Sequence, residues 1–197
     1  MEKSIENKKE KEEKLLNTAY SLFTTKGIHS TSIQDIVDNA GVAKGTFYLY
    51  FKDKYDIRNK LIKKLSNTLF QRAIDSLKKN YINNFEDQVI YIINYVVGEL
   101  VKNKLLLQFI SKDLSVSLVT DSIDKVASPE NSQETLFDFF NAKAIENGKH
   151  YDNPNATLYT IVELTGSTCF NSILYDKPLP IDAYKPYLYS VIRKILE

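Results

Sequence analysis

Apolar residues recur at the spacing of a helical face along most of the chain, and the alternation that marks a half-buried strand is hard to find. Glycines are few, and the prolines cluster late in the sequence. A hydrophobic content of 43% over 197 residues is enough for a sizeable core. We therefore expect an all-α protein.

The expected helices are bounded by glycine, asparagine, proline or capping residues. They cover about residues 7–26, 31–39, 42–50, 54–79, 85–102, 104–112, 115–125, 133–146, 155–175 and 181–196. Thr31 with Gln34 fits a capping box, Asp53 is a good N-cap, and residues 127–132 are the clearest loop between the later helices.

The composition opposes several functional classes. A single cysteine excludes an intrachain disulfide framework, and His29 and His150 share no metal-ligand spacing. We find no phosphate-binding glycine loop, no GxSxG and no HExxH, so we expect no cofactor and no metal. The charged N-terminus and the lack of a long apolar run lead us to expect a cytoplasmic protein that does not enter membranes.

The segment Asn39–Phe51, NAGVAKGTFYLYF, follows the second expected helix and contains the third. A turn of three or four residues with a glycine in it matches a helix-turn-helix. Gly41 is expected to take a positive φ, while Val42, Phe47 and Phe51 pack between the helices. Packing therefore explains the apolar residues of this segment.

The remaining residues of the segment form a polar and phenolic surface on the third helix. They are Lys44, Gly45, Thr46, Tyr48 and Tyr50, with Lys52 and Lys54 just beyond. A lysine, a hydroxyl and two phenols suit phosphate oxygens, and a glycine permits close approach to DNA. The alternative is a small helical domain that carries tyrosines on its surface.

The run TSIQDIVDNAGVAKGTFYLYFKDKYDI resembles the DNA-binding signature of the TetR/AcrR family of transcriptional repressors. The resemblance implies that Thr31 and Gln34 lie near phosphates or the groove edge, that the third helix reads DNA, and that Lys54 clamps a phosphate. Two positions depart from the family pattern. Ala43 stands where a serine or threonine cap is frequent, and Gln34 replaces a frequent arginine.

We expect a helix-turn-helix DNA-binding domain in residues 1–52 and a larger helical ligand-sensing and dimerisation domain in residues 53–197. Such proteins read two-fold operators as homodimers. The candidate dimer residues form stripes on the last two helices, which the family resemblance places in a four-helix interface. They are Leu158, Val162, Thr165, Gly166, Cys169, Ile173, Tyr184, Leu188, Val191 and Ile195. The alternative is that these stripes face their own core.

The middle helices combine many aromatic side chains with a few polar ones, as ligand pockets and ordinary helical cores both do. The candidate ligand residues are Tyr91, Asn94, Tyr95, Gln108, Phe109, Phe140, Asn141, Tyr159 and Glu163. Because no clear charge cluster accompanies them, we expect a small, largely apolar ligand.

These observations lead to one main hypothesis and two alternatives. The main one is a repressor that leaves a palindromic double-stranded operator when a small molecule binds the second domain. The first alternative is an architectural DNA-binding protein without a ligand, which requires a filled core. The second is a helical enzyme using Glu163, Tyr159 and Cys169, although no acid–base pair or nucleophile–base spacing supports it.

Overall fold

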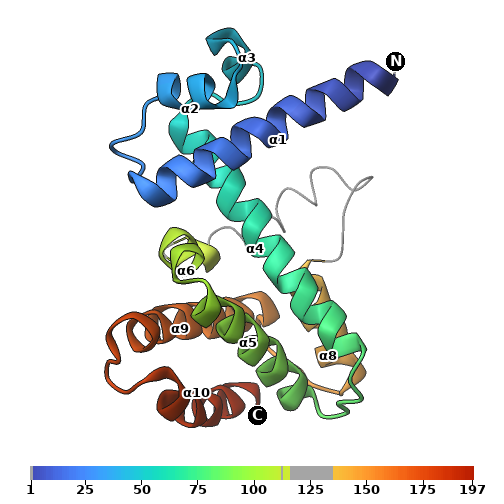
Figure 1. Cartoon of the computed structure of the whole chain (residues 1–197). Coiled ribbons are helices and arrows are strands. Elements are labelled where there is room, and N and C mark those ends of the chain that lie inside the picture. The colour runs from blue at the N-terminus through green and yellow to red at the C-terminus, as the bar shows by residue number, and fades with distance from the viewer. Residues whose placement is uncertain (1, 112, 116–134) are drawn as a thin grey trace. The chain divides into compact units, whose positions relative to one another are not determined.

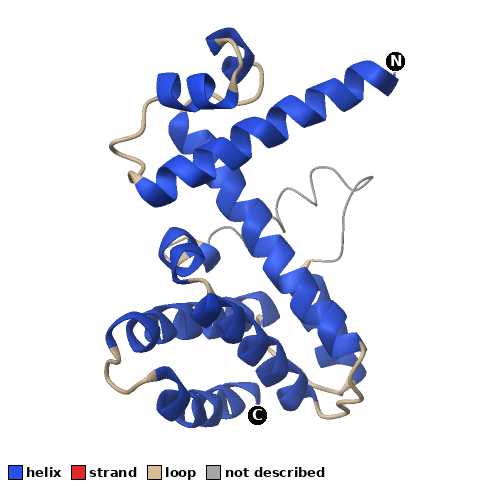
Figure 2. Cartoon of the chain, viewed as in Figure 1, coloured by secondary structure: helices blue, strands red, loops and turns tan. Residues whose placement is uncertain are grey.

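Helices form all the regular secondary structure in the part of the chain that the structure, a computed structural model, describes, namely residues 2–111, 113–115 and 135–197 (Figure 2). They are α1 (Glu2–Thr25), α2 (Ile33–Ala40), α3 (Lys44–Tyr48), α4 (Lys54–Lys78), α5 (Phe85–Lys102), α6 (Lys104–Ile110), α8 (Leu136–Glu146), α9 (Pro154–Tyr175) and α10 (Ile181–Leu196) (Figure 1). The all-α fold is confirmed.

The bounds of two helices agree with the sequence prediction at both ends. α5 and α10 begin and end where their apolar patterns do, and α9 begins one residue early, at Pro154. Pro154 suits the first turn of a helix because its missing N–H has no partner there in any case. The predicted loop at 127–132 and most of the predicted helix at 115–125 lie outside the described residues.

The chain divides into two compact units, residues 1–62 and 63–197, so the division falls within α4 and after the expected one at residue 52. We call them the N-terminal unit and the large unit. In the N-terminal unit, apolar residues of α1, α2, α3, α4 and the segment after α3 are buried. The buried residues are Leu15, Leu16, Ala19, Leu22, Phe23, Ile36, Val37, Ala40, Phe47, Phe51, Ile57, Leu61 and Ile62.

In the described residues of the large unit, the second half of α4 and helices α5, α6, α8, α9 and α10 contribute to one apolar core. α9 packs against α6, α8 and α10, and α5 packs against α8, α9 and α10 (Figure 1). In the described residues of both units, no helix is long and apolar enough to cross a membrane.

Candidate nucleic-acid interface and apolar cavity

The turn between α2 and α3 has the geometry that its glycine predicts. Gly41 takes a left-handed conformation, with φ 65°, and ends α2. Its N–H donates to the Asp38 carbonyl at 3.2 Å, and the Val42 N–H donates to the Val37 carbonyl at 3.0 Å. These bonds satisfy carbonyls at the helix end that would otherwise lack partners. The expected positive φ is confirmed.

α2 starts with a capping box, but at a different pair of residues from the expected Thr31 and Gln34. The Ser32 hydroxyl accepts from the Asp35 N–H, and the Asp35 carboxylate accepts from the Ser32 N–H at 2.8 Å. The backbone bond from Ser32 is the main reason that the pKa of Asp35 lies below its usual range. The predicted cap was therefore wrong by one residue.

Thr31 is buried, with 1% of its surface exposed, and its hydroxyl donates to the Gly27 carbonyl at 2.8 Å. This side chain joins α2 to the end of α1 and does not face the surface. Gln34 is exposed, and its side-chain amide donates to the Asp38 carboxylate at 2.8 Å. Of the two, only Gln34 is exposed where DNA could reach it, which corrects the expectation for Thr31.

α3 has Ala43 as its N-cap, and no side chain there makes a capping bond. Phe47 is buried and holds the ring of the half-exposed Tyr48 in an edge-on contact, with 5.5 Å between centroids. Phe51, also buried, contacts the Tyr50 ring at 6.2 Å. The two phenylalanines therefore position the two phenols that the sequence assigns to DNA.

The other residues assigned to this surface differ in their exposure. Lys44, Gly45 and Lys52 are exposed, and Thr46 is half-buried. Leu49, which the sequence reading passed over, is 78% exposed at the end of α3. Sequence reasoning places an apolar side chain among core residues in the core. The position of Leu49, two residues after Phe47, is the one signal that it faces outward.

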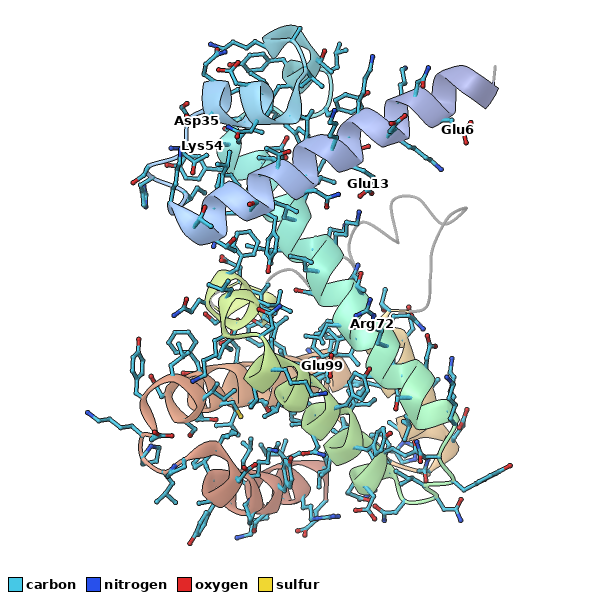
Figure 3. The ribbon with its side chains drawn as sticks, viewed as in Figure 1. Glu6, Glu13, Asp35, Lys54, Arg72 and Glu99 are labelled. Atoms are coloured by element: carbon cyan, nitrogen blue, oxygen red, sulfur yellow. The ribbon has the colours of Figure 1, made fainter. Side chains whose placement is uncertain are left out.

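Lys54 lies at the start of α4, beside the segment that joins α1 to α2 (Figure 3). Its ammonium donates to the carbonyls of Ile28, His29 and Thr31 at 2.9, 3.2 and 3.1 Å. An ammonium has three N–H donors, and each has a carbonyl here. The arrangement ties α4 to that segment, and it differs from the phosphate clamp that the family resemblance implies.

Asp53 caps α4 as expected, because its carboxylate accepts from the backbone N–H groups of Tyr55 and Asp56 at 2.8 and 2.9 Å. The Asp56 carboxylate in turn accepts from the Lys52 N–H at 2.8 Å. These bonds fix the backbone of the segment that follows α3. The lysine side chain of residue 52 is thereby carried on a rigid support.

The core of the large unit contains a cavity. The space open to the centre of a water-sized sphere is about 50 Å³. Its lining is apolar apart from Gln88 and Thr165, and no charged residue or histidine is among its described lining residues. The lining residues are Phe70, Phe85, Gln88, Val89, Ile92, Ile93, Val96, Val97, Leu100, Leu107, Leu114, Leu136, Phe139, Phe140, Leu158, Ile161, Val162, Thr165, Gly166 and Cys169.

The sequence pattern of the bacterial regulatory proteins of the tetR family matches residues 15–61, which span α1, the helix-turn-helix and the start of α4. A crystal structure of a TetR-family transcriptional regulator from Haemophilus influenzae RD covers 96% of this chain and 96% of its own, with a TM-score of 0.58 and 19% identity. The N-terminal part of the chain therefore matches the tetR family of bacterial regulatory proteins, and the whole chain has the same fold as the Haemophilus influenzae regulator.

Other relatives match over nearly the full length. The HTH-type transcriptional regulator YvdT of Bacillus subtilis (strain 168) is 26% identical over 194 residues, which are 94% of this chain and 95% of YvdT. A structure of FadR from Bacillus subtilis in complex with stearoyl-CoA covers 93% of this chain and 98% of its own, with a TM-score of 0.61 and 17% identity. At such identities the structural likeness shows the fold.

Of the nine expected ligand residues, Phe140 is the one found in the described lining. The Tyr91 hydroxyl is bonded to Ser76 at 2.8 Å, and Asn94 accepts from the Tyr189 hydroxyl at 2.8 Å. These two and the other six are not among the described lining residues, so their part in ligand binding stays a prediction. The other six are Tyr95, Gln108, Phe109, Asn141, Tyr159 and Glu163.

The residues of the expected dimer stripes differ in their exposure. Five are buried in the core of a single chain, which leaves little of their surface for a partner to cover: Leu158, Val162, Cys169, Ile173 and Leu188. Their part in a dimer interface stays a prediction. Thr165 and Gly166 are half-buried and line the cavity. Tyr184 and Ile195 are half-buried, and Val191 is exposed.

Cys169 does not have the environment of a nucleophile. Burial raises the pKa of its thiol to about 11, whereas reactive cysteines have lowered values. Among the described residues, no group of histidine, cysteine, aspartate and glutamate side chains is placed to hold a metal ion. The relatives named above are transcriptional regulators.

Proposed function

We propose that this chain is a homodimeric repressor that reads a palindromic operator with α3 and releases it when a small molecule enters the cavity of the large unit. The observation that carries the proposal is the pair of phenols at the end of α3 and just after it. Tyr48 and Tyr50 are held on the buried rings of Phe47 and Phe51, so the hydroxyls are presented on a rigid support. Rigid donors lose little conformational entropy when they bind.

The proposed DNA surface is revised from the sequence expectation. It keeps Gln34 and the residues of and after α3, adds Leu49, and omits Thr31 and Lys54, whose polar atoms are used within the fold. The proposed contacts are Gln34, Lys44, Gly45, Thr46, Tyr48, Leu49, Tyr50 and Lys52. Exposed apolar groups in such a position suit the methyl group of thymine.

The proposed dimer interface is the outer face of α9 and α10. This face carries exposed large apolar side chains, which a single chain leaves in contact with solvent, and half-buried ones between them. Its residues are Phe170, Leu174, Tyr175, Tyr184, Tyr187, Val191 and Ile195. A second copy that covers these residues would bring two reading heads together, as a two-fold operator requires.

The proposed ligand response uses the continuity of α4. Phe70 of α4 lines the cavity, and the same helix begins at Lys54 in the N-terminal unit. A ligand that prefers one position of α4 shifts the protein toward that position. The structure of FadR in complex with stearoyl-CoA supports ligand binding by a protein of this fold. The cavity favours this reading over the architectural alternative, which requires a filled core.

The direct test is DNA binding by the full-length protein. An operator is first selected from a random duplex pool, and affinity is then measured for Tyr48→Ala and for Tyr81→Ala, a control because Tyr81 is wholly exposed in the large unit. We expect Tyr48→Ala to weaken binding roughly tenfold or more, and Tyr81→Ala to bind normally. Full operator binding by Tyr48→Ala would rule out the proposed reading surface.

A further inference from the structure

Two residues that line the cavity each carry a buried polar atom that has no hydrogen-bond partner in the described chain. The two atoms are Oε1 of Gln88 on α5 and Oγ1 of Thr165 on α9. A buried polar atom without a partner is unfavourable, so a site that keeps such atoms gains free energy from any group that pairs with them.

The orientation of the Gln88 amide is set by its other end. Nε2 donates to the Ile82 carbonyl at 2.7 Å, which requires the NH₂ group on that side. The unpaired atom is therefore the carbonyl oxygen, which only accepts hydrogen bonds. The Thr165 hydroxyl both donates and accepts. A ligand that satisfies Gln88 must consequently carry an O–H or N–H group.

The rest of the lining selects against charge. The described lining residues include no lysine, arginine, histidine, aspartate or glutamate, and burial keeps the Cys169 thiol neutral by raising its pKa to about 11. Burying a carboxylate or a phosphate without a partner charge is far more costly than burying a hydroxyl that gains a hydrogen bond. Neutral ligands are therefore favoured over anions of the same size.

The size of the cavity further restricts the class of ligand. A water molecule needs roughly 10–15 Å³ on this measure, so about 50 Å³ admits a few waters or a slim chain of several carbons. A bulky ligand would have to displace core side chains. A short chain with a terminal donor fits without that cost.

We propose that the cavity binds a small, uncharged, largely apolar molecule whose hydroxyl donates to Gln88 Oε1, with Thr165 pairing with the same group or a second polar one. The inference rests on the proposed ligand-binding role of the large unit and adds the chemical class of the ligand. It separates alcohols and phenols, which fit, from carboxylates, which do not.

The test is calorimetric titration of the full-length protein with matched probes. The alcohols are 1-butanol, 1-hexanol and 1-octanol, and the anions are the carboxylates of the same chain lengths at neutral pH. Methyl pentyl ether has the length of 1-hexanol and lacks the donor. We expect at least one alcohol to bind roughly tenfold or more tightly than its carboxylate, and 1-hexanol to bind more tightly than the ether.

Two variants assign the preference to the unpaired atoms. Gln88→Leu and Thr165→Val are close in shape to the wild type, and each is expected to reduce the affinity for 1-hexanol about fivefold, with Gln88→Leu removing most of the advantage over the ether. Gln71→Leu is the matched control, because Gln71 of α4 lies outside the lining and its amide donates to the Asp75 carboxylate. A purely structural role for Gln88 would leave the ratio between alcohol and ether unchanged.

Three results would overturn the assignment: binding of none of the alcohols, equal binding of the carboxylates, or an alcohol preference that survives both variants. Operator affinity measured in the same samples tests the proposed function separately. Alcohol binding without an effect on DNA would break the proposed release mechanism and leave the ligand class standing. Release of the operator by an anion, with no alcohol binding, would support the proposed release mechanism and overturn the ligand class.

Discussion

The two units of the chain treat buried polar groups differently. In the described residues of the N-terminal unit, every buried side-chain nitrogen or oxygen has a partner, including the Thr31 hydroxyl. In the described part of the large unit four such atoms have none, on Ser66, Gln88, Asn141 and Thr165, and Gln88 and Thr165 line the cavity. A fully paired interior favours one conformation, whereas an unpaired one has free energy to gain from a ligand.

The difference lies in the interiors and does not extend to the helix ends. A capping box starts α2 in the N-terminal unit, between Ser32 and Asp35, and another starts α8 in the large unit, between Thr135 and Asp138. The Asp138 carboxylate accepts from the Thr135 N–H at 2.9 Å, close to the 2.8 Å of the first box. The two units therefore differ in the pairing of their buried polar atoms and not in the capping of their helices.

The largest expected effect comes from removing the ammonium that ties the N-terminal unit together. Lys54→Met keeps the stem and leaves the carbonyls of Ile28, His29 and Thr31 without this donor. We expect a loss of about 2 kcal/mol in the free energy of unfolding. Denaturant unfolding of the full-length variant measures this loss.

Lys52→Met is the control for Lys54→Met, because Lys52 is an exposed lysine two residues away. It is expected to change stability by less than about 0.5 kcal/mol. If Lys54→Met were as stable as wild type and bound all DNA more weakly, Lys54 would act as a phosphate clamp. Its three hydrogen bonds would then contribute little to the stability of the N-terminal unit.

The next effect is on the free energy of unfolding. The same substitution, threonine to valine, is expected to change it in opposite directions in the two units. Thr31→Val removes a buried hydroxyl that donates to Gly27, so we expect a loss of about 1 kcal/mol. Thr165→Val removes a buried hydroxyl with no partner, so we expect a gain of about 1 kcal/mol in the ligand-free protein. Both values are read from denaturant unfolding. Equal signs for the two variants would remove the contrast between the interiors.

Sequence reasoning found the fold because the helical period is a local property. The bounds of α5 and α10, the positive φ of Gly41 and the missing cap at Ala43 all depend on a few neighbouring residues. The cap of α2 shows where local rules become ambiguous. Thr31 and Ser32 both precede a suitable partner by three residues, and the choice depends on the contact of Thr31 with Gly27, which periodicity does not contain.

The large unit was harder to predict because its function depends on which face of each helix meets which neighbour. α9 carries apolar or small residues on more than one face, so Leu158 and Val162 fitted a dimer stripe as well as a core. The cavity is formed where several helices meet, and its polar atoms come from α5 and α9. No sequence window contains both Gln88 and Thr165, so their shared site could not be recognised from the sequence.

A smaller effect is expected at the uncapped end of α3. Ala43→Ser supplies a side chain that can accept from a backbone N–H of the first turn, and Ala43 already has an extended backbone suited to a cap. We expect a gain of about 0.5–1 kcal/mol in the free energy of unfolding. Ala43→Val, which supplies no acceptor, is the control. A gain with serine that valine does not match would show that the N-terminal unit is fully paired inside but not at this surface.

The smallest effect is a pH dependence of the α2 cap. The Asp35 pKa is lowered because the folded carboxylate accepts from the Ser32 N–H and hydroxyl. Its contribution to stability is therefore complete above the ordinary aspartate pKa of about 3.9. It is lost as the pH falls through the lower pKa of the folded state. Thermal unfolding of wild type and of Asp35→Asn should differ most at neutral pH and converge in acid. Because the hydroxyl of Thr31 does not titrate in this range, its hydrogen bond should persist at a pH where the Asp35 cap is lost. A stability difference between wild type and Asp35→Asn that grew toward acid would contradict the expected pH dependence.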